Sequence, residues 1–175
     1  WAIAETWQRF APMVIMMAER CLGSKSEAED VAQEVFYRVF RKAKTLRDPD
    51  ALRSFVYSFG VRALRTELRR RKVRSWLLLD RPELRAEGAH RTPDVESRDL
   101  LRRFHVLRDR LTPRDRLVFV LRRMESMTVE EIATRTELSV STVKRSMGHA
   151  TERLSRWIEA DPELSGLLDG RRWGR

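Results

Sequence analysis

The segment from Leu111 to Leu154 constrains this chain most, because it holds helix-forming stretches separated by tight turns. Thr112, Thr128 and Ser139 each place a hydroxyl immediately before such a stretch, which is the usual signal for a helix N-cap. A proline follows the first cap, and carboxylates fill the first turns after the first two. This order predicts a helix-turn-helix, a unit that places side chains of its second helix in the DNA major groove.

The stretch that begins at Ser139 has two different sides. Apolar residues recur at steps of three and four, which predicts one buried stripe: Val140, Val143, Met147, Ala150 and Leu154. Hydroxyls and cations lie off that stripe: Ser141, Thr142, Lys144, Arg145, Ser146 and His149. Such side chains can reach base edges and phosphates. A solvated face of an ordinary all-α bundle would show the same periodicity, so both interpretations stay open on pattern alone.

Helical periodicity recurs through the whole chain, while glycine and proline are scarce, at 7 and 6 of 175 residues. We therefore predict an all-α fold with two small helical domains joined by a flexible linker. The expected division is a first domain at 1–75, a linker at 76–98, a helix-turn-helix domain at 99–158 and a tail at 159–175. Pro82, Gly88 and Pro93 interrupt the linker, where no periodicity survives.

Charge follows the same division. The net charge is +10, and residues 1–75 carry 16 basic and 9 acidic side chains, against 13 and 8 in residues 99–158. The linker and the tail each carry one more acidic than basic side chain. Two basic domains flanking a nearly neutral connector are what two separate contacts with a polyanion require.

Helix boundaries can be predicted for the first domain. We expect a helix over 3–22 ended by Gly23, a second from a capping box at Ser26 to about Thr45, a turn at 48–50, and a third helix over 51–73. In the second half, a helix should restart at Thr92, with an apolar face formed by Leu100, Phe104, Leu107 and Leu111. A short helical piece is expected after Ala160, and an apolar anchor at 76–79.

The residue content of the chain argues against several classes of function. Cys21 is the only cysteine and lies in an apolar run, so we expect a buried thiol, no disulfide and no thiolate metal site. His90, His105 and His149 are scattered, and neither a metal-ligand spacing nor a phosphate-binding glycine loop appears. We therefore expect no enzyme, catalytic residue, metal or cofactor. With no apolar run long enough to cross a bilayer and no signal peptide, a cytoplasmic location is expected.

Two further surfaces suggest binding. The second predicted helix carries an acidic and polar face opposite its buried stripe, formed by Asp30, Gln33, Glu34, Tyr37 and Arg41. On a basic protein such a face suggests a basic protein partner, although a plain solvated face remains the alternative. The third helix has seven basic residues between Arg62 and Arg74, and hydroxyls at Ser54, Ser58 and Thr66, which favours binding to a nucleic-acid strand. Tyr57 could stack on unpaired bases, whereas Phe55 and Phe59 lie on the core stripe.

These parts, in this order, resemble an extracytoplasmic-function (ECF) sigma factor of bacterial RNA polymerase, in the sigma-70 superfamily. The segment AEDVAQEVFYRVFRKA resembles the polymerase-binding helix, and LRDPDALRSFVYSFGVRALRTELRRRK resembles the promoter-melting segment. The stretch from Leu111 to Leu154 resembles the C-terminal domain that reads DNA. The resemblance covers essentially residues 7–157.

The resemblance implies a function, partners and sites. It implies a role in transcription initiation, in which this chain would bind core polymerase at the coiled coil of the largest subunit and at the flap. It also implies that an anti-sigma factor controls the chain. Core-binding positions would be Asp30, Gln33, Glu34, Phe36, Tyr37 and Arg41. Positions facing the minus-ten element would be Leu46, Arg47, Asp48, Leu52, Ser58, Arg62, Arg65 and Arg69. Positions at the minus-thirty-five element would be Arg122, Ser141, Thr142, Lys144, Arg145 and His149.

The chain also departs from the family pattern at four positions. Phe55 stands where many members have Trp, and Arg62 where many have an Asn that faces a base. Glu137 occupies the helix-turn-helix turn where Gly is common, and a left-handed Glu would cost about 1 kcal/mol or more, so we expect a different turn here. Gly148 replaces a larger side chain and leaves less contact with DNA.

The alternative function is a stand-alone helix-turn-helix regulator that binds DNA without polymerase. Such a protein would need a dimer surface and a palindromic operator. No leucine-rich stripe is left over for a dimer, and the first domain would have no role. A measurement of monomer against dimer would distinguish the two.

Overall fold

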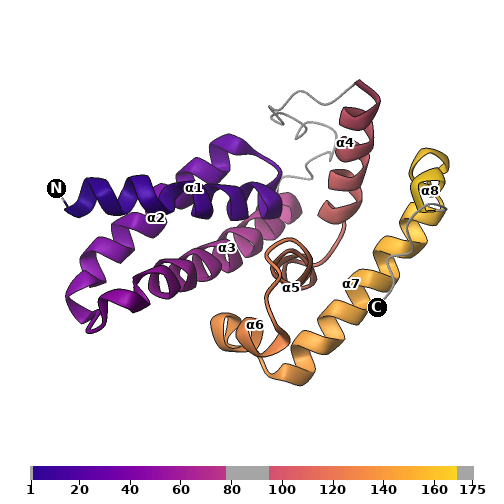
Figure 1. The fold of residues 1–175 in the computed structure, drawn as a ribbon. Coiled ribbons are helices and arrows are strands. Elements are labelled where there is room, and N and C mark those ends of the chain that lie inside the picture. The colour runs from indigo at the N-terminus through magenta and orange to yellow at the C-terminus, as the bar shows by residue number, and fades with distance from the viewer. Residues whose placement is uncertain (1, 78–94, 169–175) are drawn as a thin grey trace.

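The computed structural model describes residues 2–77 and 95–168, and within those ranges every regular element is a helix (Figure 1). The expected all-α class is therefore confirmed. The two ends of the linker predicted at 76–98 are helical, because α3 runs to Leu77 and α4 begins at Val95. The rest of that linker, with Pro82, Gly88, Pro93 and the helix restart at Thr92, and the last residues of the tail lie outside the described residues.

Three long helices make up the first half. These are α1 (Ala2–Leu22), α2 (Lys25–Lys42) and α3 (Leu52–Leu77). Two short 3-10 turns, η1 (Ala43–Thr45) and η2 (Pro49–Ala51), connect α2 to α3. In Figure 1 the three helices lie against one another, with the η1 to η2 connection at one end of the bundle.

Helical periodicity places the core of this half. In α1, Phe10, Val14, Met17 and Cys21 are all buried at steps of four, three and four. The predicted stripe of α2 is buried from Ala28 to Val39, whereas its last member, Ala43, is exposed in η1. In α3 the expected anchor at 76–79 is not seen at Leu77, which is 76% exposed.

The predicted start of the second helix is wrong by two residues, whereas the predicted end of the first is confirmed. Gly23 ends α1 with a φ of +73°, as predicted, and its N–H is donated to the Glu19 carbonyl over 2.7 Å. The N-cap of α2 is Ser24, not Ser26, and Ser24 Oγ accepts the N–H of Glu27. The predicted capping box at Ser26 is absent because Ser26 already lies inside α2, which begins at Lys25. Glu27, the third residue after the actual cap, pairs with Arg71 of α3.

Five helices make up the second half. These are α4 (Val95–Asp109), α5 (Pro113–Arg123), α6 (Val129–Thr136), α7 (Val140–Glu159) and α8 (Pro162–Leu168). The apolar face expected on α4 is confirmed, because Leu107 and Leu111 are buried in a cluster with residues of α5, α7 and α8. The short helical piece expected in the tail is α8.

The helix starts of this half are the ones predicted from sequence. Thr112, Thr128 and Ser139 each accept an N–H of the following turn through their hydroxyl oxygens. Thr128 also completes a capping box with Glu131, and these two hydrogen bonds lower the pKa of the Glu131 carboxyl.

The turn that follows α6 differs from what was expected. Glu137 adopts the left-handed conformation with φ 57° and ψ 38°, so the turn keeps its usual geometry although the residue is not glycine. The expectation of a different turn was wrong. A side chain held there costs at least about 1 kcal/mol, so contacts of this residue must offset the cost.

The two halves share one core, which sequence analysis did not predict. Residues 115–121 of α5 are all buried, so this helix is covered on every side. Leu117, Val118, Val120 and Leu121 belong to the same apolar cluster as the buried residues of α1, α2 and α3, while Phe119 belongs to the cluster formed with α4, α7 and α8. In Figure 1, α5 accordingly lies between α3 and the rest of the second half.

The buried thiol of Cys21 gives a first testable expectation. Burial raises its pKa from 9.0 to about 12, with the nearby Arg108 opposing the shift. The thiol should therefore fail to react with a thiol reagent at mildly alkaline pH until urea unfolds the chain. Because the unfolded thiol ionises near 9.0, this group's contribution to stability is complete below that pH and is lost as pH rises toward 12. Rapid labelling of the folded chain would contradict this packing.

Two helical glycines offer a matched pair of substitutions. A Cβ at Gly148 in α7 would meet nothing within 4 Å, whereas one at Gly60 in α3 would lie 2.6 Å from Met17 Cε. We expect Gly148→Ala to raise the free energy of unfolding by about 0.5–1 kcal/mol, since alanine loses less backbone entropy in a helix. Gly60→Ala should give no such gain, because Met17 is fully buried and the added methyl overpacks the core. Urea denaturation of both variants would check this, and an equal gain would contradict it.

Candidate functional site

The acidic face predicted on α2 is exposed to solvent. We keep this name for Asp30, Gln33, Glu34, Tyr37 and Arg41, all of which are exposed. Local contacts between successive turns hold its side chains in place: Glu34 accepts a hydrogen bond from Arg38 Nε over 2.6 Å, and the Arg41 guanidinium lies 5.5 Å from the centre of the Tyr37 ring. Tyr37 is 58% exposed and presents its ring to solvent.

Phe36 does not belong to this face. It is only 1% exposed and stacks on Trp7 of α1, with ring centroids 4.8 Å apart. The expectation that it touches a partner is not supported by this position, because no surface of the ring is free. Phe36 instead supports the acidic face from behind by packing α2 onto α1.

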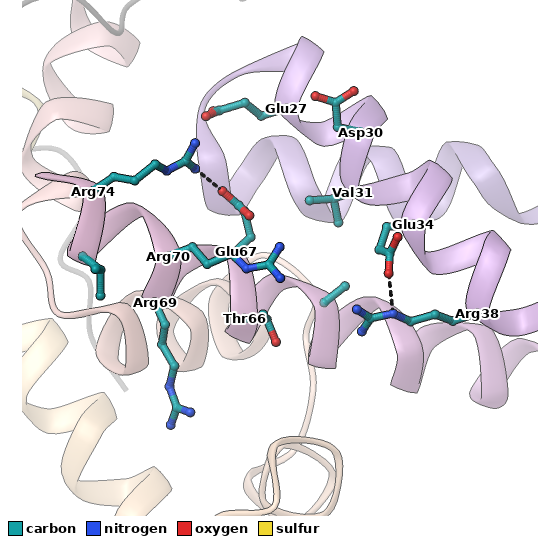
Figure 2. Close-up of a pocket in the computed structure, with 12 residues that line it drawn as sticks. Glu27, Asp30, Val31, Glu34, Arg38, Thr66, Glu67, Arg69, Arg70 and Arg74 are labelled. Carbon is teal, nitrogen blue, oxygen red and sulfur yellow. Dashed lines mark hydrogen bonds and ion pairs between the residues drawn. The ribbon is translucent and has the colours of Figure 1, made fainter.

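A groove between α2 and α3 was missed by the sequence analysis. It encloses about 870 Å³ and has an acidic wall on α2 and a basic wall on α3 (Figure 2). Asp30 and Glu34 line one wall, and Arg69 and Arg70 line the other. Arg74 and Glu67, which also line the wall on α3, form an ion pair of 2.5 Å. The sequence had assigned Asp30 and Arg69 to two different surfaces, and the structure places both on the rim of one groove.

The loop that precedes α3 is exposed and well defined by local hydrogen bonds. Asp48 is the N-cap of η2, and its Oδ1 accepts the N–H of Asp50 over 2.9 Å. Arg47 is exposed beside it, and Leu46 and Leu52 are half-buried at the two ends of the loop. The four minus-ten residues predicted before α3 and at its start therefore lie together on one surface.

The remaining minus-ten residues, on α3, are partly covered by the second half of the chain. Arg62 Nη2 lies 3.2 Å from Glu137 Oε1, and Arg65 Nη1 lies 3.7 Å from Glu137 Oε2. Ser58 Oγ accepts a hydrogen bond of 3.1 Å from Arg135 of α6. Arg69 is exposed.

The aromatic residues of α3 follow the prediction in part. Phe55 and Phe59 stack edge to face at 4.9 Å and pack against the core, as expected. Tyr57 is only 8% exposed, and its hydroxyl donates a 2.9 Å hydrogen bond to Glu125 Oε2. Burial, followed by the charge of Glu125, raises the pKa of this phenol well above its ordinary value. In this conformation Tyr57 cannot stack on a base.

The basic face of α7 is open. Ser141, Lys144, Arg145 and His149 are exposed, and Thr142 is half-buried. The hydroxyls of Ser139, Ser141 and Thr142 form a hydrogen-bonded cluster at the start of the helix. Ser146, which the sequence placed on the polar side, is fully buried, because the helix also packs on α5 over this part of its surface. Arg122 is exposed at the end of α5 and donates a hydrogen bond to the Met127 carbonyl over 3.1 Å.

In the described part of the chain, no group of three or more histidine, cysteine or acidic side chains could hold a metal ion. None of the helices seen is long and apolar enough to span a membrane.

Both halves of the chain match families of known proteins. Residues 6–74 match the family model of sigma-70 region 2, and residues 101–154 match that of sigma-70 region 4. The chain is 31% identical over 137 residues to the ferric citrate uptake sigma factor FecI of Escherichia coli, an alignment that covers 76% of this chain and 77% of that protein. It is 26% identical over 161 residues to the RNA polymerase sigma-H factor of Pseudomonas aeruginosa, covering 86% and 83% of the two chains.

A solved structure has the same fold. The sigma factor RpoE, crystallised with the anti-sigma factor NepR from Bartonella quintana, superimposes with a TM-score of 0.62 and 15% identity, covering 90% of this chain and 97% of that one. A stand-alone helix-turn-helix regulator is not favoured, since the first half also matches a sigma region. The chain belongs to the extracytoplasmic-function sigma factors of the sigma-70 family, which direct core RNA polymerase to promoters.

Proposed function

We propose that this chain recognises promoters through three surfaces, each of which binds a different partner. The acidic face of α2 binds the coiled coil of the largest polymerase subunit. The loop at 46–52 and the cationic side of α3 bind the minus-ten element, and the basic face of α7 binds the minus-thirty-five element. The observation that carries the proposal is the separation of charge: exposed carboxylates gather on α2, while arginines and lysines gather on α3 and α7.

The acidic face suits a cationic protein partner and not DNA. Asp30 and Glu34 are one turn apart on the same side of α2, so both can meet a basic helix laid across them. Tyr37 adds an exposed aromatic ring, a residue type enriched at protein interfaces. The groove behind this face gives side chains of the partner a place to enter.

The minus-ten surface suits an opened strand. The loop around Asp48 is solvent-facing and its turn is held by the Asp48 cap, so an extruded base can reach it and the turn is already formed. Extrusion of a base costs a few kcal/mol, which the contacts in the loop must offset. The arginines of α3 hold the phosphates of the same strand.

The basic face of α7 supplies the second contact. Its first turn carries hydroxyls, and Lys144 and Arg145 follow, which is the arrangement that reads base edges and phosphates from the start of a recognition helix. Two weak contacts in one chain raise each other's effective concentration, so the pair can select a promoter that neither would hold alone.

An anti-sigma factor is the proposed inhibitory partner. The support is the RpoE structure, which was solved with such a protein. The flap of the polymerase is proposed as a further contact of the second half, on family resemblance. The direct test of the whole proposal is transcription from a matched promoter with purified core polymerase. Failure of the chain to bind core would contradict it.

Charge reversal separates the proposed surfaces. Asp30→Lys with Glu34→Lys should weaken core binding by at least about tenfold, because like charges brought together at an interface cost several kcal/mol. Glu159→Lys, at the exposed far end of α7, serves as the control and should leave core binding unchanged. Binding of the full chain to a mixed-sequence duplex, measured by fluorescence anisotropy, should not fall in the double variant. Equal loss of core and duplex binding would show that the face is misassigned.

Salt dependence tests the role of α7. Lys144→Ala and Arg145→Ala should each reduce the slope of log affinity against log salt by about 1, since each would remove one phosphate contact. Arg156→Ala, in the last turn of the same helix, should leave the slope unchanged because Arg156 pairs with Glu152, far from the helix start. Promoter binding by the holoenzyme at several salt concentrations gives the slopes. A larger change for Arg156 than for Lys144 would place the DNA elsewhere on the chain.

A further inference from the structure

Helix α3 has a second side, which the assignment to DNA does not use. Thr66, Arg70 and Val73 follow one another at steps of four and three, so they lie along one side of the helix, and all three line the groove between α2 and α3. Arg62, which was assigned to the minus-ten strand, does not line this groove. We call the side formed by Thr66, Arg70 and Val73 the groove side of α3.

The floor of the groove is apolar. Val31 of α2 and Ala63 of α3 both line it and are only 7% and 6% exposed, so they lie at its base. Val73 lies on the α3 wall and is 57% exposed, so an occupant of the groove can cover it. An apolar side chain that enters the groove would therefore be removed from water on several sides.

Several charged groups of the groove are already paired within one wall. On α2, Glu34 accepts a hydrogen bond from Arg38 over 2.6 Å, and on α3, Glu67 accepts one from Arg74 over 2.5 Å (Figure 2). These pairs hold their side chains along the walls, so they leave the space between the walls open.

Two charged groups on opposite walls are not paired in this way. Within the described part of the chain, the side chains of Asp30 on α2 and Arg70 on α3 form no ion pair or hydrogen bond. Figure 2 shows the Arg70 side chain directed toward α2, whereas the Arg69 side chain is directed away from it. The groove thus presents a carboxylate and a guanidinium across an apolar floor.

These two groups decide what can occupy the groove. A nucleic-acid strand is disfavoured, because its phosphates would lie beside Glu27, Asp30 and Glu34. A purely basic segment would be repelled by Arg70 on the other wall. The groove suits a helix with a cation on one side, a carboxylate on the other and an apolar side chain between them. Its volume of about 870 Å³ is that of about two turns of a helix about 10 Å wide.

We propose that one helix of the polymerase coiled coil is seated in this groove and is held by both walls. A cation of that helix pairs with Asp30, a carboxylate pairs with Arg70, and an apolar side chain between them packs on the floor. The inference rests on the proposed function, which assigns the coiled coil to α2, and it adds the groove side of α3 to the same interface. Helix α3 then serves two partners, DNA on the side of Arg62 and polymerase on the side of Arg70.

Charge reversal on α3 tests the second wall. Arg70 is exposed, so Arg70→Glu should fold, and it should weaken binding of the full chain to purified core polymerase by at least about fivefold, because two carboxylates would then face each other. Arg53→Glu is the matched control, since Arg53 is an exposed arginine of the same helix outside the groove. Both substitutions change the net charge by the same amount. Equal loss of core binding in the two variants would therefore overturn the proposal.

A double-mutant cycle tests whether both walls hold the same helix. Asp30→Ala and Arg70→Ala should each weaken core binding. The double variant should lose less affinity than the product of the two single losses, because a helix released by one wall no longer rests against the other. A double loss equal to the product would mean that the two residues act on separate surfaces of the partner, and would overturn the seating of one helix between them.

Proximity gives a readout that a change of charge cannot imitate. A photo-crosslinking residue in place of Thr66, which lines the groove and is exposed, should form a covalent product with the largest polymerase subunit in the intact complex. The same residue in place of Glu159, at the far end of α7, is the control and should form no such product. A product with a different subunit, or no product at Thr66 while the complex is intact, would contradict the proposed occupant.

Failure of this inference can be distinguished from failure of the proposed function. Loss of core binding in the variant with Asp30→Lys and Glu34→Lys, together with no loss in Arg70→Glu, would keep the assignment of the acidic face and overturn the seating in the groove. If the unchanged chain does not bind core polymerase, the proposed function is contradicted and the inference falls with it.

Discussion

Burial of α5 on all sides is the constraint on which the rest of the structure depends. Residues 117–121 of α5 are apolar and buried over the whole circumference of the helix, so this part must be surrounded. It shares one apolar cluster with α1, α2 and α3 and another with α4, α7 and α8. The two sigma regions consequently share a core. This arrangement brings the turn at Glu125 onto α1 and α3 and sets α6 against α3.

The distribution of charge follows the same packing. Cations are concentrated on α3 and α7, where like charges crowded together repel one another. The carboxylates of Glu125 and Glu137 form ion pairs with Arg20, Arg62 and Arg65, which reduces this repulsion on α3. The basic face of α7 has no comparable cover and remains exposed.

Local features were predictable because they depend on neighbours within one or two turns. The N-caps at Thr112, Thr128 and Ser139, the glycine cap at Gly23 and the buried stripe of α2 were read from spacing alone and are confirmed. The family and its all-α fold were likewise identified from the order of motifs. The start of α2 was misplaced by two residues because Ser24 and Ser26 are each followed by a glutamate three residues later, so the local pattern does not distinguish the two caps.

What the tertiary structure alone decided is which side chains are free to act. Phe36 was assigned to an interface but lies in the core, and Ser146 was assigned to a polar face but is buried. Tyr57 was predicted to be able to stack on unpaired bases, but its hydroxyl donates a hydrogen bond to Glu125. Each outcome depends on contacts with another part of the chain, in the case of Tyr57 one 68 residues away, and periodicity carries no information about such contacts. The sequence by itself determined the helices, the family and the charge of each surface. The packing of α5 and α6 determined which of those surfaces is covered, because burial depends on where distant segments meet.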